Sequence, residues 1–300
     1  MLRAFAARFP AAAGHYRRVR SNVRDVRDMY ISRRLVPVDT PLGFKFGGLA
    51  STFHAEMQRG TFEANEVRLL RALFSHVDLF VDVGANVGYF TCLARHAGLP
   101  AVAIEPLPGN LLALFENLRV NGWNDTEVLP MAATDHTGIE TFYGASSTSA
   151  SLIDRWNHAP STFKRTICVS TLERMLCGRS GEPRILLKMD VEGHEYAALV
   201  GAAPLLSARV QPLCLVEITL HEYHPGGGNP HFRECFELFF SRGYQALLLE
   251  GSELRMVTAQ DVAGYAAANR TGSVFVNYLF VPPDMAAVIP QARAALGVVS

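Results

Sequence analysis

Two kinds of apolar pattern alternate along the chain from about residue 60 onward. Runs rich in apolar and β-favouring residues, bounded by turn residues, predict buried strands. They cover residues 79–83, 101–105, 127–133, 185–190, 213–218, 244–249 and 273–281. Apolar residues at helical spacing predict helices between them, at residues 61–73, 89–96, 111–120, 195–200 and 231–242. This alternation predicts an α/β fold with a mostly parallel seven-stranded sheet and helices on both faces.

The chain before residue 60 has a different character. No acidic residue occurs in residues 1–24, which contain six arginines: Arg3, Arg8, Arg17, Arg18, Arg20 and Arg24. We predict a basic helical segment to about residue 34, then short strands and turns over residues 36–53. We therefore divide the chain into an N-terminal basic helical and extended segment, residues 1–59, and a main domain, residues 60–300. A solvated leading helix is favoured over a targeting peptide or a membrane-surface helix.

Composition narrows the class of protein further. The chain has 28 basic and 28 acidic residues, so its net charge gives no indication of a nucleic-acid partner. No apolar run reaches the roughly 18 residues of a membrane-spanning helix. The five cysteines are widely spaced, without a C-x-x-C pair, which favours buried free thiols in a reducing compartment. These features predict a soluble cytoplasmic protein without an integral membrane segment.

Ligands of parallel sheets bind beyond the carboxyl ends of the strands. The first predicted strand ends in residues 82–88, D-V-G-A-N-V-G. Gly84 and Gly88 permit a tight turn and close approach of the backbone to a ligand. Asn86 stands where a dinucleotide loop has its second glycine, which disfavours a nicotinamide cofactor. Glu105, at the end of the next strand, suits ribose hydroxyls. Together the two loops predict a nucleoside site without a phosphate cradle, as S-adenosylmethionine (SAM) requires.

The fourth main strand ends in a cluster of charged residues. Residues 187–195 contain Lys188, Asp190, Glu192, His194 and Glu195. The ends of the first and fourth strands face each other in such a sheet, so Asp190 is predicted close to the sulfonium of SAM. A carboxylate there favours the positive charge and is a candidate base for the acceptor proton. Capping of the next helix is the alternative role for Asp190 and Glu192.

The fifth strand and the loop after it supply competing bases. Glu217, at the end of a buried strand, needs a partner or a function. His221 and His224 lie in a glycine-rich loop that is predicted to close over the acceptor, and either imidazole is a candidate base, as is His194. Metal binding by the two loop histidines is disfavoured, because they are not held on a rigid helix. We predict no metal site.

Five segments together resemble the FkbM family of SAM-dependent methyltransferases. They are residues 60–63 (GTFE), 80–88 (FVDVGANVG), 104–106 (IEP), 188–195 (KMDVEGHE) and 216–218 (VEI). The resemblance spans residues 60–281 and implies a Rossmann-like class I methyltransferase fold for the main domain. It implies O-methylation of a hydroxyl on a sugar, polyketide or other secondary-metabolite acceptor, either a small molecule or a glycan. The implied cofactor-binding residues are Glu63, Asp82, Gly84, Asn86, Gly88, Glu105 and Asp190.

Two other functions compete with this interpretation. A nicotinamide-dependent oxidoreductase is disfavoured by Asn86 in place of the second glycine. A catalytically silent SAM-fold module, which would bind a partner through the basic N-terminal segment, is disfavoured by the intact motif around Asp190. A P-loop enzyme is excluded, since no G-x-x-x-x-G-K-[ST] sequence occurs.

Overall fold

The computed structural model of the protein describes most of the predicted main domain. The described residues are 34–49, 52–144, 150–158, 164–177, 179, 183–221, 223–268 and 277–297. The predicted leading basic helix therefore lies outside the described residues, as do residues 273–276 of the last predicted strand. No helix in the described ranges is long and apolar enough to cross a membrane.

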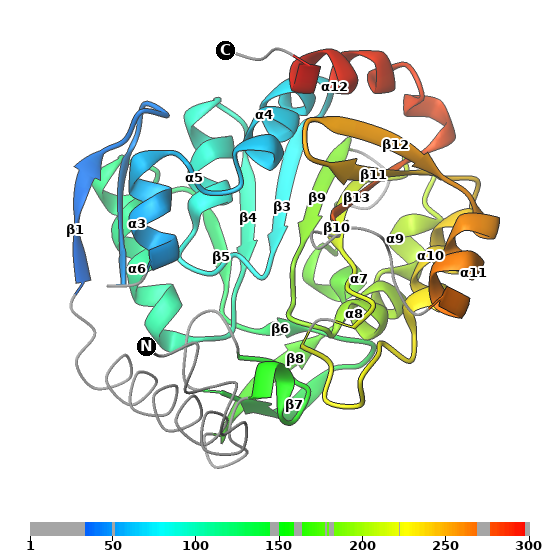
Figure 1. Ribbon diagram of the computed structural model, residues 1–300. Helices are drawn as coiled ribbons and strands as arrows, with labels where there is room; N and C mark the ends of the chain where they lie inside the picture. The colour runs from blue at the N-terminus through cyan, green and yellow to red at the C-terminus, as the bar shows by residue number, and fades with distance from the viewer. Residues whose placement is uncertain are drawn as a thin grey trace, which may run out of the picture.

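An eight-stranded sheet forms the centre of the molecule, in the order β12-β11-β13-β10-β9-β3-β4-β5 (Figure 1). Its strands are β3 (Leu79–Val83), β4 (Ala101–Ile104), β5 (Glu127–Leu129), β9 (Ile185–Met189), β10 (Leu213–Glu217), β11 (Gln245–Glu250), β12 (Glu253–Val257) and β13 (Asn277–Val281). The strands from β10 to β5 are parallel, whereas β13 is antiparallel to both of its neighbours. The predicted α/β class is confirmed, and most predicted strand ends lie within a few residues of the observed ones.

Two details of the predicted sheet are wrong. The sheet has eight strands rather than seven, because a tight turn at Gly251, with φ of 56°, adds β12 to β11 as an antiparallel edge hairpin. The strand predicted over residues 127–133 is two strands in different sheets, β5 and β6 (Ala132–Ala133). Pro130 lies between them and has no N–H for a ladder hydrogen bond, so the pairing breaks there.

Helices cover both faces of the main sheet and bury two apolar cores. One face carries α3 (Thr52–Arg59), α4 (Ala64–Leu73), α5 (Tyr89–His96), α6 (Pro108–Val120) and α12 (Val288–Gly297). The other carries α7 (Leu172–Met175), α8 (Glu195–Gly201), α9 (Ala203–Leu206), α10 (Phe232–Phe240) and α11 (Ala259–Ala268). Residues of β3 alternate between the cores, with Phe80 in the first and Val81 in the second, as a period of two requires.

Two smaller sheets extend this domain. In a three-stranded sheet, β8 (Lys164–Ser170) lies between β6 and β7 (Gly138–Tyr143). A hairpin of β1 (Arg34–Asp39) and β2 (Lys45–Leu49) packs against α6, where Asn117 accepts a hydrogen bond of 2.7 Å from the backbone N–H of Gly47. The predicted division between residues 59 and 60 stays a prediction.

The cysteines are all free, but only some of them are buried. Cys92, Cys214 and Cys235 lie in the cores, in agreement with the prediction of buried thiols. Cys168 and Cys177 are exposed, which corrects that prediction. Alternate residues of β8 point to solvent, and Cys168 occupies one of these outward positions.

Candidate active site

A cleft opens at the carboxyl ends of β3, β4 and β9. It contains about 850 Å³ of empty space, including the part open to solvent. The turns after the three strands form one wall. Another wall is apolar and comes from the three-stranded sheet β6-β8-β7 and the segment that follows β7, including Phe142, Ala150 and Leu152. The cleft therefore lies where the order of the strands predicts a ligand site.

The turn after β3 is packed against the turn after β9. Gly84 has a φ of 82°, and a Cβ on it would lie 1.8 Å from the backbone oxygen of Asp190. The backbone N–H of Asp190 donates to the Val83 oxygen at 3.0 Å. Asn86 also has a positive φ, of 51°, and its side chain is of the type that tolerates this conformation best after glycine. Glycine at position 84 is therefore required by the close approach of two backbones.

Glu105 connects the turn after β3 to the start of α6. Its Oε2 accepts from the backbone N–H of Asn86 at 2.9 Å, and its Oε1 accepts from Leu107 N–H at 2.8 Å and from Asn110 Nδ2 at 3.2 Å. Burial raises the pKa of Glu105 to about 7, although these hydrogen bonds oppose the shift. Glu105 therefore faces the cleft and also joins the turn after β3 to the segment that leads into α6.

Asp82 and Gly88 support the turn from outside the cleft lining. Asp82 is buried in β3, where its Oδ2 accepts from the Thr91 hydroxyl at 2.6 Å. Burial raises its pKa, against the opposing effect of Lys188. Gly88 begins α5 in the left-handed conformation, with φ of 84°, and a Cβ on it would meet the Leu114 side chain at 3.0 Å.

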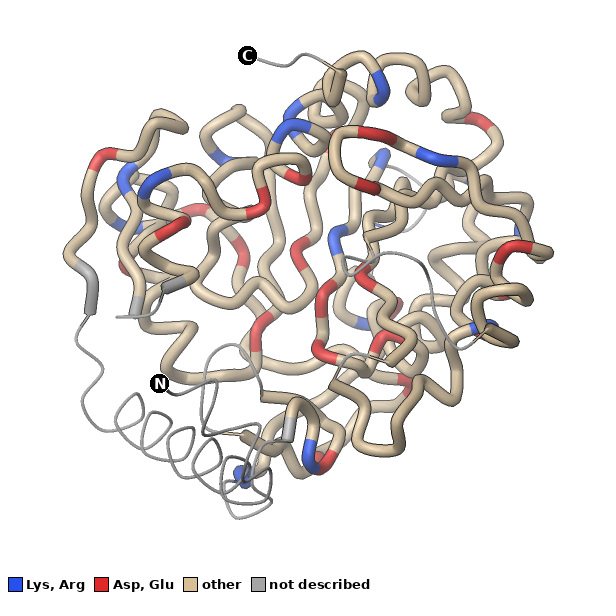
Figure 2. Tube along the Cα trace, in the orientation of Figure 1, with Lys and Arg blue, Asp and Glu red and all other residues tan. Residues whose placement is uncertain are grey.

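Lys188 is the central cation of an acidic site. It is buried, its Nζ lies 3.6 Å from Asp190 Oδ2, and it sits 4.6 Å from the centre of the Phe90 ring. Burial by itself lowers the pKa of Lys188, but the surrounding carboxylates, with Asp190 and Glu63 foremost, outweigh burial and raise it. Figure 2 shows acidic residues gathered around the ends of the central strands. This cation holds Asp190 beside the cleft.

Glu63 lines the same cleft within electrostatic reach of Lys188 and Asp190, and its backbone is strained. It precedes α4 in the left-handed region, with φ of 44°, and its half-buried side chain lines the cleft. Burial raises its pKa to about 8; Lys188 opposes the shift, and Glu66 and Asp190 add to it. A non-glycine residue with this φ is uncommon, and such strain occurs preferentially at functional sites.

Trp156 fixes the motif that follows β9. Its Nε1–H donates to Glu192 Oε2 at 2.7 Å, and its ring lies against Gly193, where a Cβ would come within 2.2 Å of the ring. The Ser151 hydroxyl donates to the backbone oxygen of Glu192 at 2.6 Å. The segment around residues 151–156 thus holds the turn between β9 and α8 in the shape that exposes Glu192 to the cleft.

His194 is the one imidazole among the described residues that line the cleft. Its Nε2 lies 3.0 Å from the Thr134 hydroxyl. Burial lowers the pKa of His194, and the nearby Asp135 and Glu140 oppose the shift. The ring is therefore predominantly neutral near pH 7, the form in which imidazole accepts a proton.

The other three predicted bases, Glu217, His221 and His224, lie outside the lining of this cleft. Glu217 ends β10, and burial, followed by the charge of Asp190, raises its pKa. His221 Nδ1 donates to the backbone oxygen of Gly227 at 2.9 Å, within its own glycine-rich loop. In that loop His224 packs edge-on against Trp156, with ring centres 4.7 Å apart. Among the described residues, no group of three or more His, Cys, Asp or Glu is arranged to hold a metal ion.

The structure adds residues that the sequence patterns did not indicate. Trp156 lies in a stretch without apolar periodicity, so no local signal marked it. Thr134 directly follows a predicted strand, and the rule that chemistry follows strand ends would have found it. The sequence pattern places Tyr89 and Phe90 only on a helix, although both line the cleft.

The cleft fits SAM in charge and in unsatisfied polar groups. The sulfonium and the ammonium of SAM are both positive, and the lining carries Glu63, Asp190 and Glu192 around the cation of Lys188. The Tyr89 hydroxyl is buried without a hydrogen-bond partner among the described residues, and the residue lines the cleft. A buried unpaired hydroxyl is costly, so a ligand atom is expected to pair with it.

The strand order, the glycine turn and the acidic cleft define a SAM-dependent methyltransferase with the class I fold. The sequence model of the FkbM methyltransferase domain matches residues 82–246, more than half of the chain. The chain therefore belongs to the FkbM methyltransferase family, and its cofactor is SAM.

Several solved structures are similar to the chain at low identity. An O-methyltransferase from Bacillus cereus in complex with SAH matches with 12% identity and a TM-score of 0.40, over 73% of this chain and 79% of that one. The ribosomal protein L11 methylase from Lactobacillus delbrueckii subsp. bulgaricus matches with 12% identity and a TM-score of 0.38, over 76% and 79%. The bifunctional kinase-methyltransferase WbdD matches with 11% identity and a TM-score of 0.44, over 83% and 44%. No curated protein sequence matches the chain.

Proposed function

We propose that the protein transfers the methyl group of SAM to a hydroxyl of a small-molecule or glycan acceptor, such as a sugar or a polyketide. The observation that carries this proposal is the position of Asp190 and His194 in the lining of the cofactor cleft, a few residues apart on one turn. Methyl transfer to oxygen needs a positioned hydroxyl and a group that accepts its proton. A carboxylate beside a neutral imidazole supplies both.

The cofactor side of the site is formed by the turns after β3 and β4. The backbone of Gly84, Asn86 and Gly88 shapes the turn, and Glu105 holds it against α6. A carboxylate has about four lone-pair positions, and protein donors take three on Glu105, which leaves capacity for ribose. Glu63 pairs with the ammonium of SAM in this proposal, and Asp82 supports the turn through its hydrogen bond to Thr91 of α5.

The acceptor side lies at the turn after β9. Asp190, in its ion pair with Lys188, orients the acceptor hydroxyl and offsets the positive sulfonium charge. Lys188 is the one lysine or arginine among the described residues of the lining and is paired with Asp190, so the cleft has few cations for phosphates, which favours neutral acceptors over nucleic acids. Free cysteines throughout the chain agree with a cytoplasmic location.

Two successive measurements test the proposal. Calorimetry with SAM and with its demethylated product, S-adenosylhomocysteine (SAH), is expected to give micromolar binding. Labelled methyl transfer from SAM onto panels of glycans and polyketides, followed by mass spectrometry of the products, is then expected to locate the methyl group on oxygen. Methyl groups found on nitrogen or carbon would contradict O-methylation while leaving the methyltransferase assignment intact. SAM binding with no transfer to any panel would favour the silent module.

A further inference from the structure

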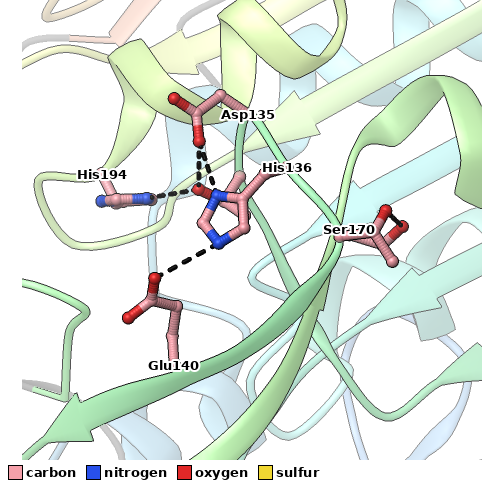
Figure 3. A network of polar contacts seen from close by, with 7 residues as sticks. Asp135, His136, Glu140, Ser170 and His194 are labelled. Carbon is pink, nitrogen blue, oxygen red and sulfur yellow. Dashed lines mark hydrogen bonds and ion pairs between the residues drawn. The ribbon is translucent and has the colours of Figure 1, made fainter.

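A chain of polar side chains leads from the cleft to the surface through the turn after β6 (Figure 3). The Thr134 hydroxyl is buried, and it lies 3.0 Å from His194 Nε2 and 3.3 Å from Asp135 Oδ1. Asp135 Oδ1 also lies 2.8 Å from His136 Nδ1, and His136 Nε2 lies 3.2 Å from Glu140 Oε1. The last three side chains are about half exposed.

The donor and acceptor of each hydrogen bond between His194, Thr134 and Asp135 follow from the chemistry of the three side chains. A carboxylate only accepts hydrogen bonds, so Thr134 donates its one hydroxyl hydrogen to Asp135. The hydroxyl oxygen then accepts from His194, which requires the proton of the neutral ring to be on Nε2. Nδ1 of His194 consequently has a lone pair and no proton.

We propose that His194 is the base that accepts the hydroxyl proton through Nδ1, and that Thr134 and Asp135 are positioning residues that fix its tautomer and orientation. This inference rests on the proposed O-methylation and deepens it, because it separates deprotonation from the orienting role of Asp190. Thr134 and Asp135 lie outside the FkbM motifs of the sequence, and their roles follow from the contacts alone.

The hydroxyl proton passes from the acceptor to His194 during methyl transfer. Bound SAM supplies a methyl group on positively charged sulfur. As the acceptor oxygen forms its bond to this methyl group, the carbon–sulfur electron pair stays on sulfur, and the O–H electron pair stays on oxygen. The released proton becomes the second N–H of the His194 ring. Asp135, through the Thr134 hydroxyl, stabilises the resulting imidazolium, which returns its proton to solvent after the product has left.

The charges facing His194 agree with this role. Burial lowers the pKa of His194, and Asp135 and Glu140 raise it, while His136 adds a lowering effect. The pKa of His136 is itself raised, first of all by its hydrogen bond to Asp135. The ring is therefore a neutral base whose protonated form the Asp135 carboxylate favours, as a carboxylate does for a hydrogen-bonded histidine in other enzymes.

The test reads the tautomer and the titration of His194 directly, so it needs no acceptor. Nitrogen-15 spectra of the full chain, with and without SAH, are recorded over a range of pH, and His194→Gln identifies the His194 signals. The wild type is expected to show the Nε2–H tautomer. Thr134→Val is expected to lose this preference and give a mixture, and Asp135→Asn is expected to lower the pKa of His194 further.

Thr137→Val is the matched control, because the Thr137 hydroxyl pairs with Ser170 and not with His194. It is expected to leave the His194 signals unchanged. An Nδ1–H tautomer in the wild type, or an unchanged tautomer in Thr134→Val, would overturn the inference and leave the proposed function standing. If Thr134→Val does not fold, the inference is tested by the tautomer of His194 in the wild type and by the pKa of His194 in Asp135→Asn. Absence of SAH binding by the wild type would instead overturn the proposed function, and the inference with it.

Discussion

At the scale of single residues, the cleft is a group of carboxylates held at close range around one lysine. Burial favours the protonated form of a carboxyl group, and a neighbouring cation favours the charged form. Glu63 lies on the protonated side of this balance, with its pKa raised to about 8. Relative to the unfolded chain it retains a proton between pH 4.5 and about 8, so its stabilising contribution falls as pH rises through this range.

Binding of SAM should therefore release protons near pH 7. The positive ammonium and sulfonium favour the charged form of Glu63, which is mostly protonated at this pH in the empty cleft. SAH lacks the sulfonium and should release fewer protons. Calorimetry in buffers with different ionisation enthalpies measures the release. Glu63→Gln should reduce it, whereas Glu116→Gln, on the exposed face of α6, should not. Equal release by all three proteins would show that Glu63 does not sense the cofactor.

The Asp190 carboxylate should serve turnover more than cofactor binding. Asp190→Asn keeps the shape of the side chain and removes its charge, so the acceptor hydroxyl is oriented less well and single-turnover methyl transfer at saturating SAM should fall by roughly 10²-fold. SAM affinity should change little in this variant. Asp125→Asn, at an exposed ion pair with Arg95, is the surface control. A rate for Asp190→Asn close to that of the wild type would leave Asp190 with a capping role only.

At the scale of elements, the turn after β3 depends on a glycine at one position. Gly84 and Gly98 both have a φ of +82°, but only at Gly84 would a Cβ meet another backbone. Gly98→Ala should therefore cost about 1–2 kcal/mol, the strain of the left-handed conformation alone. Gly84→Ala should cost roughly 3–5 kcal/mol and weaken SAM binding, because the turn must separate from Asp190. Denaturant unfolding of the two variants gives the comparison, and equal losses would contradict it.

The elements that the sequence predicted are those with a strong internal pattern. The boundaries of β3 and α5 match the prediction, because a short buried apolar run and a helical repeat each lie between clear turn residues. β12 and α11 have weaker patterns, since an edge strand and an exposed helix bury few residues. α12 contains Pro290 in its first turn, where proline is tolerated although it usually signals a break.

The residues of the site likewise divide into those with a clear sequence pattern and those without one. Motif residues at strand ends were predicted, because chain order alone brings the turns after β3, β4 and β9 together. Trp156 and Thr134 reach the site from the segments around the small sheet, and their contacts depend on how that sheet packs. Glu217 was predicted from its strand-end position, but the lining of the cleft does not extend to it. A strand end thus predicts proximity to the site, and packing decides which side chains face the ligand.

At the scale of the whole molecule, the cleft lies between the main sheet and the three-stranded sheet β6-β8-β7, and its lining is rich in carboxyl groups. The ammonium and sulfonium of SAM favour the charged forms of these carboxyl groups, whereas the two phosphates of a dinucleotide oppose them. The backbone of the turn at Asn86 is also held by Glu105, which occupies an N–H that a phosphate would need. Both features predict that SAM stabilises the folded protein against unfolding and that NADH does not.

Thermal unfolding of the full chain measures this difference without an acceptor. A ligand that binds only the folded protein stabilises it by about 2.7 kcal/mol at 100 times its Kd. For a chain of this size SAM should then raise the melting temperature by roughly 5 °C. NADH at the same concentration should leave it unchanged, because its phosphates meet the carboxylates of the cleft. Glu105→Ala should reduce the SAM shift by about half or more at that concentration, because it removes a charge-assisted hydrogen bond worth about 1.5–3 kcal/mol, with Glu250→Ala as the exposed control. A shift with NADH that equals or exceeds the shift with SAM would contradict the electrostatic argument for the whole cleft.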